Sequence, residues 1–389
     1  MKTYVIIGAG VVGCALAREL LLQKRGKVIL LEKEPKLAMH ASGRNSGVIH
    51  SGINQKPGSL KASLCVEGSR LLREYCLANG VPMKECGTMV VAGDASKVPV
   101  LENLLRMGRE CGVPELSMMD PEEMEKKEPE ALGVKALWSP TGAVVDSACL
   151  VETLATEVRA LGAEIFLGEE VIGIEASTVR TKKSKVSADH VVNCAGLYAD
   201  KVAGWMGADD EYRVIPFRGE YKQVLGKNVN SMIYQAPDLR FPFLSVHLTK
   251  TVHGDLIAGP TAVLSFGRES YDKRVNALET FDYLTRARFY KLLFQPSFFA
   301  MSAHALRLSF SDAAFRAEIE KLVGPVSRDN IHPYRSGIRA QMVDRRGRFV
   351  EDLVVSFSKN TTQVLNCVSP GLTCSLAFAK HLDQRMHPA

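Results

Sequence analysis

The strongest constraint on the fold is a run of three glycines near the start of the chain, Gly8-x-Gly10-x-x-Gly13. It directly follows an apolar stretch that predicts a buried strand, and it opens a helix predicted over residues 12–23. A second apolar strand ends at Glu32. In such a unit the glycines permit a tight turn and let the backbone approach a pyrophosphate closely. The acid accepts a hydrogen bond from a ribose hydroxyl. The pattern predicts a dinucleotide-binding fold but does not separate NAD from FAD.

Two later glycine-containing junctions bear on the choice between these cofactors. Asn193-Cys194-Ala195-Gly196 follows an apolar strand in mid-chain, and Ser369-Pro370-Gly371-Leu372-Thr373 opens the last predicted helix. A helix N-terminus at the second junction would stabilise the negative charge of a reduced flavin. Either junction alone fits an ordinary strand–turn–helix connection. Together with the first motif they favour FAD.

The chain has 389 residues, which predicts two domains rather than one. We expect an α/β fold of the D-amino-acid-oxidase type, in which a Rossmann-like FAD-binding domain is interrupted by an α+β substrate domain. The FAD-binding domain is assigned to residues 1–75, 147–208 and 334–389. The substrate-binding domain is assigned to residues 76–146 and 209–333.

Net charge and cysteine content indicate which partners and which cellular compartment to expect for this chain. The formal net charge is +6, and no compact basic run with interleaved aromatic residues is present, which argues against nucleic-acid binding. The nine cysteines include no C-x-x-C pair. We therefore predict reduced thiols, a cytoplasmic location and no metal site. No uncharged apolar run reaches the ~18 residues needed to span a bilayer, so any membrane contact would be peripheral, on the inner face.

The segment from Arg44 to Gly52 combines small residues with a single histidine, His50. Its small, uncharged centre suits a backbone that packs against a large planar cofactor. A lone histidine is more often structural than catalytic, but the glycines on both sides of His50 favour a functional role. The predicted cofactor-binding set is Gly8, Gly10, Val12, Gly13, Glu32, Lys33, Asn45, Ser46, Gly47, Val171, Ala195, Gly196, Ser369, Pro370, Gly371, Leu372 and Thr373.

At these residues the chain resembles the FAD-dependent L-2-hydroxyglutarate dehydrogenases and oxidases, a branch of the D-amino-acid-oxidase-like superfamily. The resemblance is carried by residues 31–75, 87–92, 139–146, 216–221, 241–249, 259–264 and 337–341. It implies oxidation of L-2-hydroxyglutarate, a short 2-hydroxy dicarboxylate, to 2-oxoglutarate by hydride transfer to flavin N5. The electrons would then pass to a quinone, to oxygen or to a flavoprotein.

This reaction needs a base for the hydroxyl proton and a cation for a carboxylate. Histidine, with an unperturbed pKa near ~6.5, suits the base, and His50 is the first candidate with His247 second. Arginine binds a carboxylate through two parallel hydrogen bonds, and Arg339 is the first choice for this role. Arg218 and Arg268 are further candidates for which a surface charge is an equal alternative, and Tyr221 completes the predicted substrate-binding set.

Three positions depart from the family pattern and leave alternatives open. Gly371-Leu372 stands where two alanines are usual and is closer to glycerol-3-phosphate dehydrogenases. Gly267 replaces a lysine, and His50 is followed by Ser51-Gly52-Ile53-Asn54-Gln55, a segment in which two tyrosines are usual. A glycerol-3-phosphate dehydrogenase, an amino-acid or amine oxidase, and a flavin-binding redox sensor without catalysis therefore stay open. In some sarcosine-oxidising relatives a histidine in a similar segment carries the flavin covalently, which is a second role for His50.

Residues 281–310 interleave aromatic with basic side chains. This mixture suits an interfacial helix on an acidic membrane surface. The alternative is a helix buried in the substrate domain, which aromatic content alone favours. The aromatic and aliphatic residues are Phe281, Tyr283, Leu284, Phe289, Tyr290, Leu292, Leu293, Phe294, Phe298 and Phe299, and the basic residues are Arg286, Arg288 and Lys291.

Overall fold

The computed structural model describes residues 1–207, 210–238 and 245–388. Its first layer is a six-stranded sheet with the strand order β20-β21-β13-β1-β2-β9, in which β1 pairs in parallel with both β2 and β13. Only the pairing of β20 with β21 is antiparallel. The strands are β1 (Thr3–Ile7), β2 (Lys27–Glu32), β9 (Glu164–Leu167), β13 (His190–Asn193), β20 (Val354–Phe357) and β21 (Thr361–Asn366). The βαβ unit predicted from the glycine motif is present.

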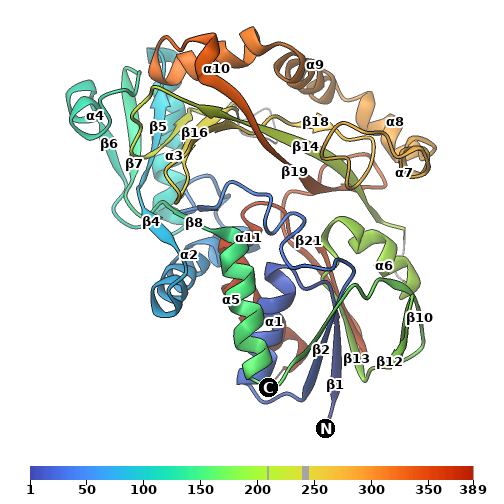
Figure 1. The fold of residues 1–389 in the computed structure, drawn as a ribbon. Helices are drawn as coiled ribbons and strands as arrows, with labels where there is room; N and C mark the ends of the chain where they lie inside the picture. Colours follow the sequence, from blue (N-terminus) through green and yellow to red (C-terminus); the bar gives the residue numbers. More distant parts are fainter. Residues whose placement is uncertain (208–209, 239–244, 389) are drawn as a thin grey trace.

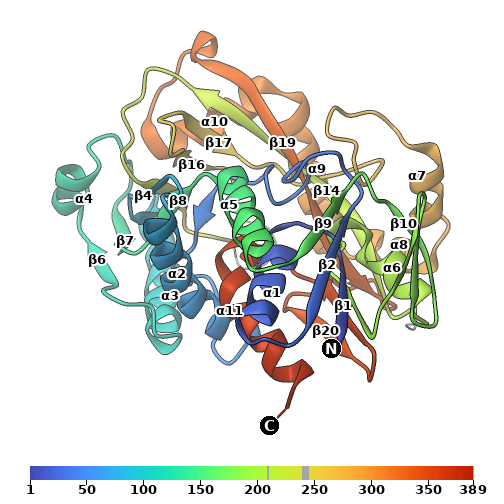
Figure 2. The ribbon, with the colours of Figure 1, turned by 60° about the horizontal axis from the view of Figure 1, so that its bottom comes forward.

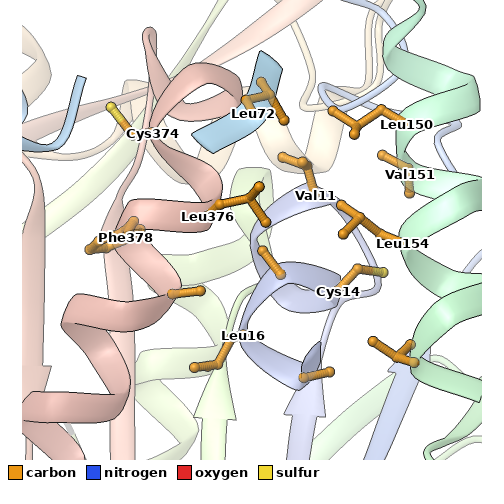
Figure 3. Packing of buried hydrophobic residues seen from close by; sticks show 14 of the residues in the cluster. Val11, Cys14, Leu16, Leu72, Leu150, Val151, Leu154, Cys374, Leu376 and Phe378 are labelled. Carbon is orange, nitrogen blue, oxygen red and sulfur yellow. The ribbon is translucent and has the colours of Figure 1, made fainter. Parts of the chain in front are cut away.

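Helices cover one face of this sheet, and a small sheet covers the other (Figures 1 and 2). On the helical face α1 (Val11–Leu22) lies between α5 (Ser147–Ala160) and α11 (Gly371–Met386), where its apolar side chains pack against both (Figure 3). The opposite face carries the sheet of β10 (Val171–Glu175), β11 (Thr178–Thr181) and β12 (Lys185–Ser187), next to α6 (Ala199–Trp205). Alternate residues of β1 join the two cores, as expected for a strand buried on both sides.

A nine-stranded mixed sheet lies over the carboxyl ends of the parallel strands (Figure 1). Its two longest strands, β14 (Tyr212–Val224) and β19 (Ile331–Asp344), pair in antiparallel register. The others are β5 (Thr88–Ala92), β6 (Ser117–Met119), β7 (Lys135–Ser139), β15 (Met232–Gln235), β16 (His247–Lys250), β17 (Leu256–Gly259) and β18 (Val263–Leu264).

The helices of the substrate domain pack on this larger sheet. They are α3 (Val98–Glu110), α4 (Pro121–Lys127), α7 (Ala277–Leu284), α8 (Ala287–Leu293), α9 (Pro296–Phe310) and α10 (Asp312–Val323), with short 3₁₀ turns at Ala95–Lys97, Gly196–Tyr198 and Arg328–Asn330. The helix α2 (Leu60–Asn79) and a three-stranded sheet of β3 (Val48–Ile49), β8 (Ala143–Val145) and β4 (Met83–Glu85) connect the two layers.

Two features differ from the sequence-based expectation. The predicted domain boundaries at 75 and 334 fall inside α2 and β19, and β19 belongs to the substrate sheet because it pairs with β14. The predicted aromatic helix over 281–310 consists of parts of three helices, interrupted before Ala287 and at Pro296, which occupies the first turn of α9.

No helix among the described residues is long and apolar enough to cross a bilayer. All nine cysteines lie in the described part of the chain and are free thiols.

Candidate functional site

The glycine turn between β1 and α1 has the geometry that a bound pyrophosphate requires. Gly8 has a positive φ of +101°, and a Cβ atom there would lie 2.6 Å from the carbonyl oxygen of Cys194. A Cβ on Gly13 would lie 2.0 Å from the carbonyl oxygen of Gly8. The N-terminus of α1 at Gly10 has no side-chain cap from its own N-cap residue. The hydroxyl of Ser42 accepts the N–H of Val11 at 3.0 Å at this helix end. Since β13 pairs with β1, the turn at Ala195 lies directly beside it.

Glu32 is fixed at the end of β2 by two backbone groups. Its carboxylate accepts hydrogen bonds from the N–H of Ala9 and the N–H of Glu34, both at 3.0 Å. The side chain is thus held between the glycine turn and the residues after β2. This is the place at which a dinucleotide fold binds the ribose hydroxyls.

We expect Glu32→Arg to weaken FAD retention strongly, because it removes the ribose acceptor and adds bulk and positive charge. The measurement is the dissociation constant of FAD from flavin fluorescence. Glu152→Arg on the exposed face of α5 makes the same charge change elsewhere and should bind FAD as the wild type does. Unchanged FAD affinity in Glu32→Arg would contradict the assignment.

The N-terminus of α11 is a second helix end at the site. Its N-cap, Pro370, makes no side-chain cap, and the first turn contains no acidic residue. The buried hydroxyl of Thr373 accepts the backbone N–H of His50 at 3.0 Å. Nearby, the ammonium of Lys61 donates to the carbonyl oxygen of Ser369 at 3.1 Å, and burial lowers the pKa of Lys61. The helix dipole and this ammonium both favour negative charge at the turn.

The segment before β3 is held rigidly in place. The side chain of Asn45 accepts the N–H of Gly47 at 2.7 Å and donates to the carbonyl oxygen of Ser42 at 2.8 Å. Gly47 has a φ of +73°, and a Cβ there would lie 2.3 Å from the carbonyl oxygen of Val145. Arg335 donates to the carbonyl oxygen of Asn45 at 2.6 Å. Together with the N-termini of α1 and α11, this backbone forms a cradle that fits FAD.

His50 and His247 lie close enough to influence each other. His50 follows β3, and its Nε2 lies 3.4 Å from the hydroxyl of Ser369. His247 begins β16, and its Nδ1 donates to the carbonyl oxygen of Ser245 at 3.0 Å, which leaves Nε2 as its basic nitrogen. Burial lowers the pKa of His50 to about 4. Burial, together with the nearby His50 and Arg339, lowers the pKa of His247 to about 3.

Arg339 and Tyr221 belong to the same group. One guanidinium nitrogen of Arg339 donates to the carbonyl oxygen of Thr261 at 3.0 Å. Arg339 stands opposite Phe217 in the β14–β19 register, and its charge acts on the phenol of Tyr221. Tyr221 also interacts with Ser46 in the flavin cradle. The structure thus brings His50, His247, Arg339 and Tyr221 together.

Arg218 and Arg268 do not join this group. Arg218 is in register with Ile338, so it lies on the opposite face of the strand pair from Arg339, where it contacts Glu220 at 3.2 Å. Arg268 is buried in a bidentate pair with Asp200, at 2.6 and 2.9 Å. Both guanidinium groups are therefore engaged within the protein, and the substrate-binding role expected for them stays a prediction.

The other predicted residues lie around the cofactor cradle or beside it. Val12 is in the first turn of α1, and Val171 begins β10. Lys33 forms ion pairs with Glu34 and Glu269. His40 lies with these two acids in a group that could hold a cation, but it is already hydrogen bonded to Glu34 at 2.8 Å. The segment 241–244, part of the family resemblance, lies outside the described residues.

Comparison with known proteins assigns the family. The family model described as FAD dependent oxidoreductase matches residues 3–385. The chain belongs to this family of FAD-dependent oxidoreductases. The predicted cofactor, FAD, is thereby confirmed.

Three relatives by sequence carry the name L-2-hydroxyglutarate dehydrogenase. An L-2-hydroxyglutarate dehydrogenase of Indibacter alkaliphilus is 38% identical over 386 residues, covering 96% of each chain. The human mitochondrial L-2-hydroxyglutarate dehydrogenase is 35% identical, covering 96% of this oxidoreductase and 86% of the human protein. The Escherichia coli protein of that name is 30% identical, covering 99% and 93%.

Solved structures confirm the fold of the oxidoreductase. An L-α-glycerophosphate oxidase from Mycoplasma pneumoniae with FAD bound superposes with a TM-score of 0.79 at 24% identity, covering 99% of this chain and 95% of that one. A glycine oxidase from Geobacillus kaustophilus gives a TM-score of 0.73 at 16% identity, covering 100% and 96%. At these identities the likeness concerns the fold alone.

Two residues of the site were not predicted. The ring of Tyr234 stacks on the His247 ring, with 4.1 Å between centroids, and Lys61 binds the turn before α11. Lys61 lies within a segment that resembles the family. It is also a basic residue in the first turn of a helix, where a cation is unfavourable, and this unusual position was a signal that could have identified it. Tyr234 lies in β15, outside every resembling segment, and carried no such signal.

Proposed function

We propose that this protein oxidises L-2-hydroxyglutarate to 2-oxoglutarate with FAD as its cofactor. The observation that carries the proposal is the meeting of His50, His247, Arg339 and Tyr221 beside the α11 turn. These residues come from four distant parts of a chain whose full-length relatives are named L-2-hydroxyglutarate dehydrogenase.

The chemistry divides between the cofactor and the protein. Bound FAD supplies the acceptor for the hydride that leaves the substrate carbon. His50 takes the proton of the substrate hydroxyl, because its unprotonated form is the stable one near neutral pH. Arg339 binds a substrate carboxylate and so orients the carbon atom that is oxidised. His247 stacks on Tyr234 and lies near both His50 and Arg339.

The product provides a direct test of this proposal. Anaerobic reaction with excess L-2-hydroxyglutarate should give one molecule of 2-oxoglutarate for each flavin that is reduced. Mass spectrometry of the small molecules checks the ratio. Flavin reduction without 2-oxoglutarate would contradict the proposal.

The pKa of His50 predicts the pH dependence of flavin reduction. A base must be unprotonated to act, so the rate should fall as the pH decreases through about 4 and should be level above that range. An exposed histidine would instead give a rise centred near ~6.5. Rapid-mixing measurements of the flavin reduction rate between pH values of about 4 and ~6.5 distinguish a buried base from an exposed one. A rise centred near ~6.5 would show that His50 does not act as the buried base described here.

We also propose that α7, α8 and α9 contact an acidic membrane surface. These helices lie along the outer side of the substrate domain (Figure 1). Phe281, Phe294 and Phe299 are 69%, 83% and 72% exposed, and Lys291 beside them is exposed too. Phe289 and Phe298 are each only 3% exposed and pack in the core. The segment thus has one buried aromatic side and one exposed aromatic side, and the exposed side is suited to contact a membrane surface. Contact with a membrane would favour a membrane quinone as the electron acceptor.

Removal of two exposed aromatic rings tests the membrane contact. Phe294→Ser with Phe299→Ser should weaken flotation with acidic liposomes by about tenfold or more, since each inserted ring contributes roughly 1.5–3 kcal/mol. Leu77→Ser, at an exposed position on α2, is the matched control and should float like the wild type. Equal flotation of all three proteins would count against attachment.

A further inference from the structure

A small cavity lies beside His50. It is lined by residues 50–55 together with Thr88 and Tyr234, and its volume is about 20 Å³. This volume accommodates one water molecule, for which about 10–15 Å³ is enough, but not the chain of a dicarboxylate. None of the lining residues carries a permanent charge.

The walls of this cavity contain buried polar atoms without hydrogen-bond partners. Within the described residues, the hydroxyls of Ser51 and Tyr234 and the side-chain oxygen of Asn54 have none. Ser51 is 4% exposed and Tyr234 is 5% exposed, so bulk water does not satisfy them. Burial raises the pKa of Tyr234, and the hydroxyl of Thr249 near it also lacks a partner of normal hydrogen-bond geometry. Buried polar groups of native proteins are nearly always satisfied, by protein or by an ordered water.

The position of the cavity connects the catalytic base with the surface. Its lining begins at His50 and Ser51 and continues to the half-buried Asn54 and Gln55, after which Lys56 is exposed. Burial makes the protonated form of His50 unfavourable, so a proton that arrives there must leave within the same turnover.

We propose that this cavity holds one ordered water molecule that receives the proton taken up by His50 and passes it toward solvent. The inference rests on the proposed role of His50 as the base. One proton leaves the substrate hydroxyl for His50, and one proton leaves His50 for the water, which the Ser51 and Tyr234 hydroxyls hold. The water gives up another proton toward the half-buried end of the cavity at Asn54 and Gln55. The net change is one proton released to solvent, with no further oxidant or reductant.

The test removes one hydroxyl at a time. Tyr234→Phe and Ser51→Ala should each slow anaerobic flavin reduction by about tenfold, less than loss of the base itself. The wild type should show a curved dependence of the rate on the D₂O fraction, because more than one proton moves, and each variant should show a linear one. FAD content and the affinity for 2-oxoglutarate should stay unchanged. Tyr212→Phe, near the far end of β14, is the matched control.

The outcomes separate this inference from the proposed function. Wild-type rates and wild-type D₂O dependence in both variants would overturn the water relay, while reduction by L-2-hydroxyglutarate would still stand. A wild-type protein that L-2-hydroxyglutarate does not reduce would overturn both. A crystal structure offers a measurement independent of rates. It should show a water within hydrogen-bond distance of the Ser51 and Tyr234 hydroxyls, and an empty cavity would overturn the proposal.

Discussion

Replacement of His50 by alanine is expected to leave FAD bound and to slow flavin reduction by L-2-hydroxyglutarate by about 10²–10⁴-fold, the usual effect of a positioned proton acceptor. FAD should stay bound because the main chain of His50, not its ring, is held by Thr373. The measurement is the rate of anaerobic flavin reduction at saturating substrate, with flavin content determined on the same sample.

A histidine in an exposed position supplies the control for this variant. His332→Ala on β19 should reduce its flavin at the wild-type rate, because His332 is exposed and lies outside the site. A wild-type rate in His50→Ala would exclude His50 as the base and move the role to His247. A third result is that the mass of the denatured wild-type protein exceeds the chain mass by one FAD while that of His50→Ala does not. This result would identify His50 as a covalent attachment point instead.

Arg339→Lys is expected to lower kcat/KM by about 10–10²-fold, since a hydrogen bond to a charged group contributes roughly 1.5–3 kcal/mol. Lysine keeps the positive charge but presents a point charge in place of the planar fork that binds a carboxylate in two places. The loss should appear largely in kcat/KM, because a carboxylate anchor holds ground state and transition state alike. Steady-state kinetics with L-2-hydroxyglutarate measure the effect.

The strand β14, which pairs with the strand of Arg339, offers a control for this substitution. Arg218→Lys makes the same change on the opposite face of β14 and β19, where the side chain contacts Glu220 rather than the site. Its kcat/KM should stay close to that of the wild type. A larger loss in Arg218→Lys than in Arg339→Lys would show that the carboxylate is bound on the other face.

The cofactor half of the site could be predicted from sequence because its geometry is local. The glycine turn, the acid at the end of β2 and the turn before α11 each lie within one short segment, and their backbone needs are visible in the residue types. The same reasoning predicted the helix over residues 12–23, which is α1 at Val11–Leu22, and the strand that ends at Glu32.

The substrate half depends on contacts between distant segments, and there the sequence was less informative. Arg268 is held by Asp200, a residue 68 positions earlier, and nothing local to Arg268 indicates that partner. The faces of Arg218 and Arg339 follow from the register of β14 against β19, which tertiary structure sets. Phe298 and Phe299 are adjacent in sequence, yet one is buried and the other exposed, because helix geometry directs neighbouring side chains to different sides.

The most direct test of the proposed substrate is anaerobic mixing of the purified FAD protein with L-2-hydroxyglutarate, D-2-hydroxyglutarate and glycerol 3-phosphate at equal concentrations. The proposed function predicts that L-2-hydroxyglutarate removes the visible flavin absorbance much faster than the other two compounds. Faster reduction by glycerol 3-phosphate, or no reduction by any of the three, would contradict it.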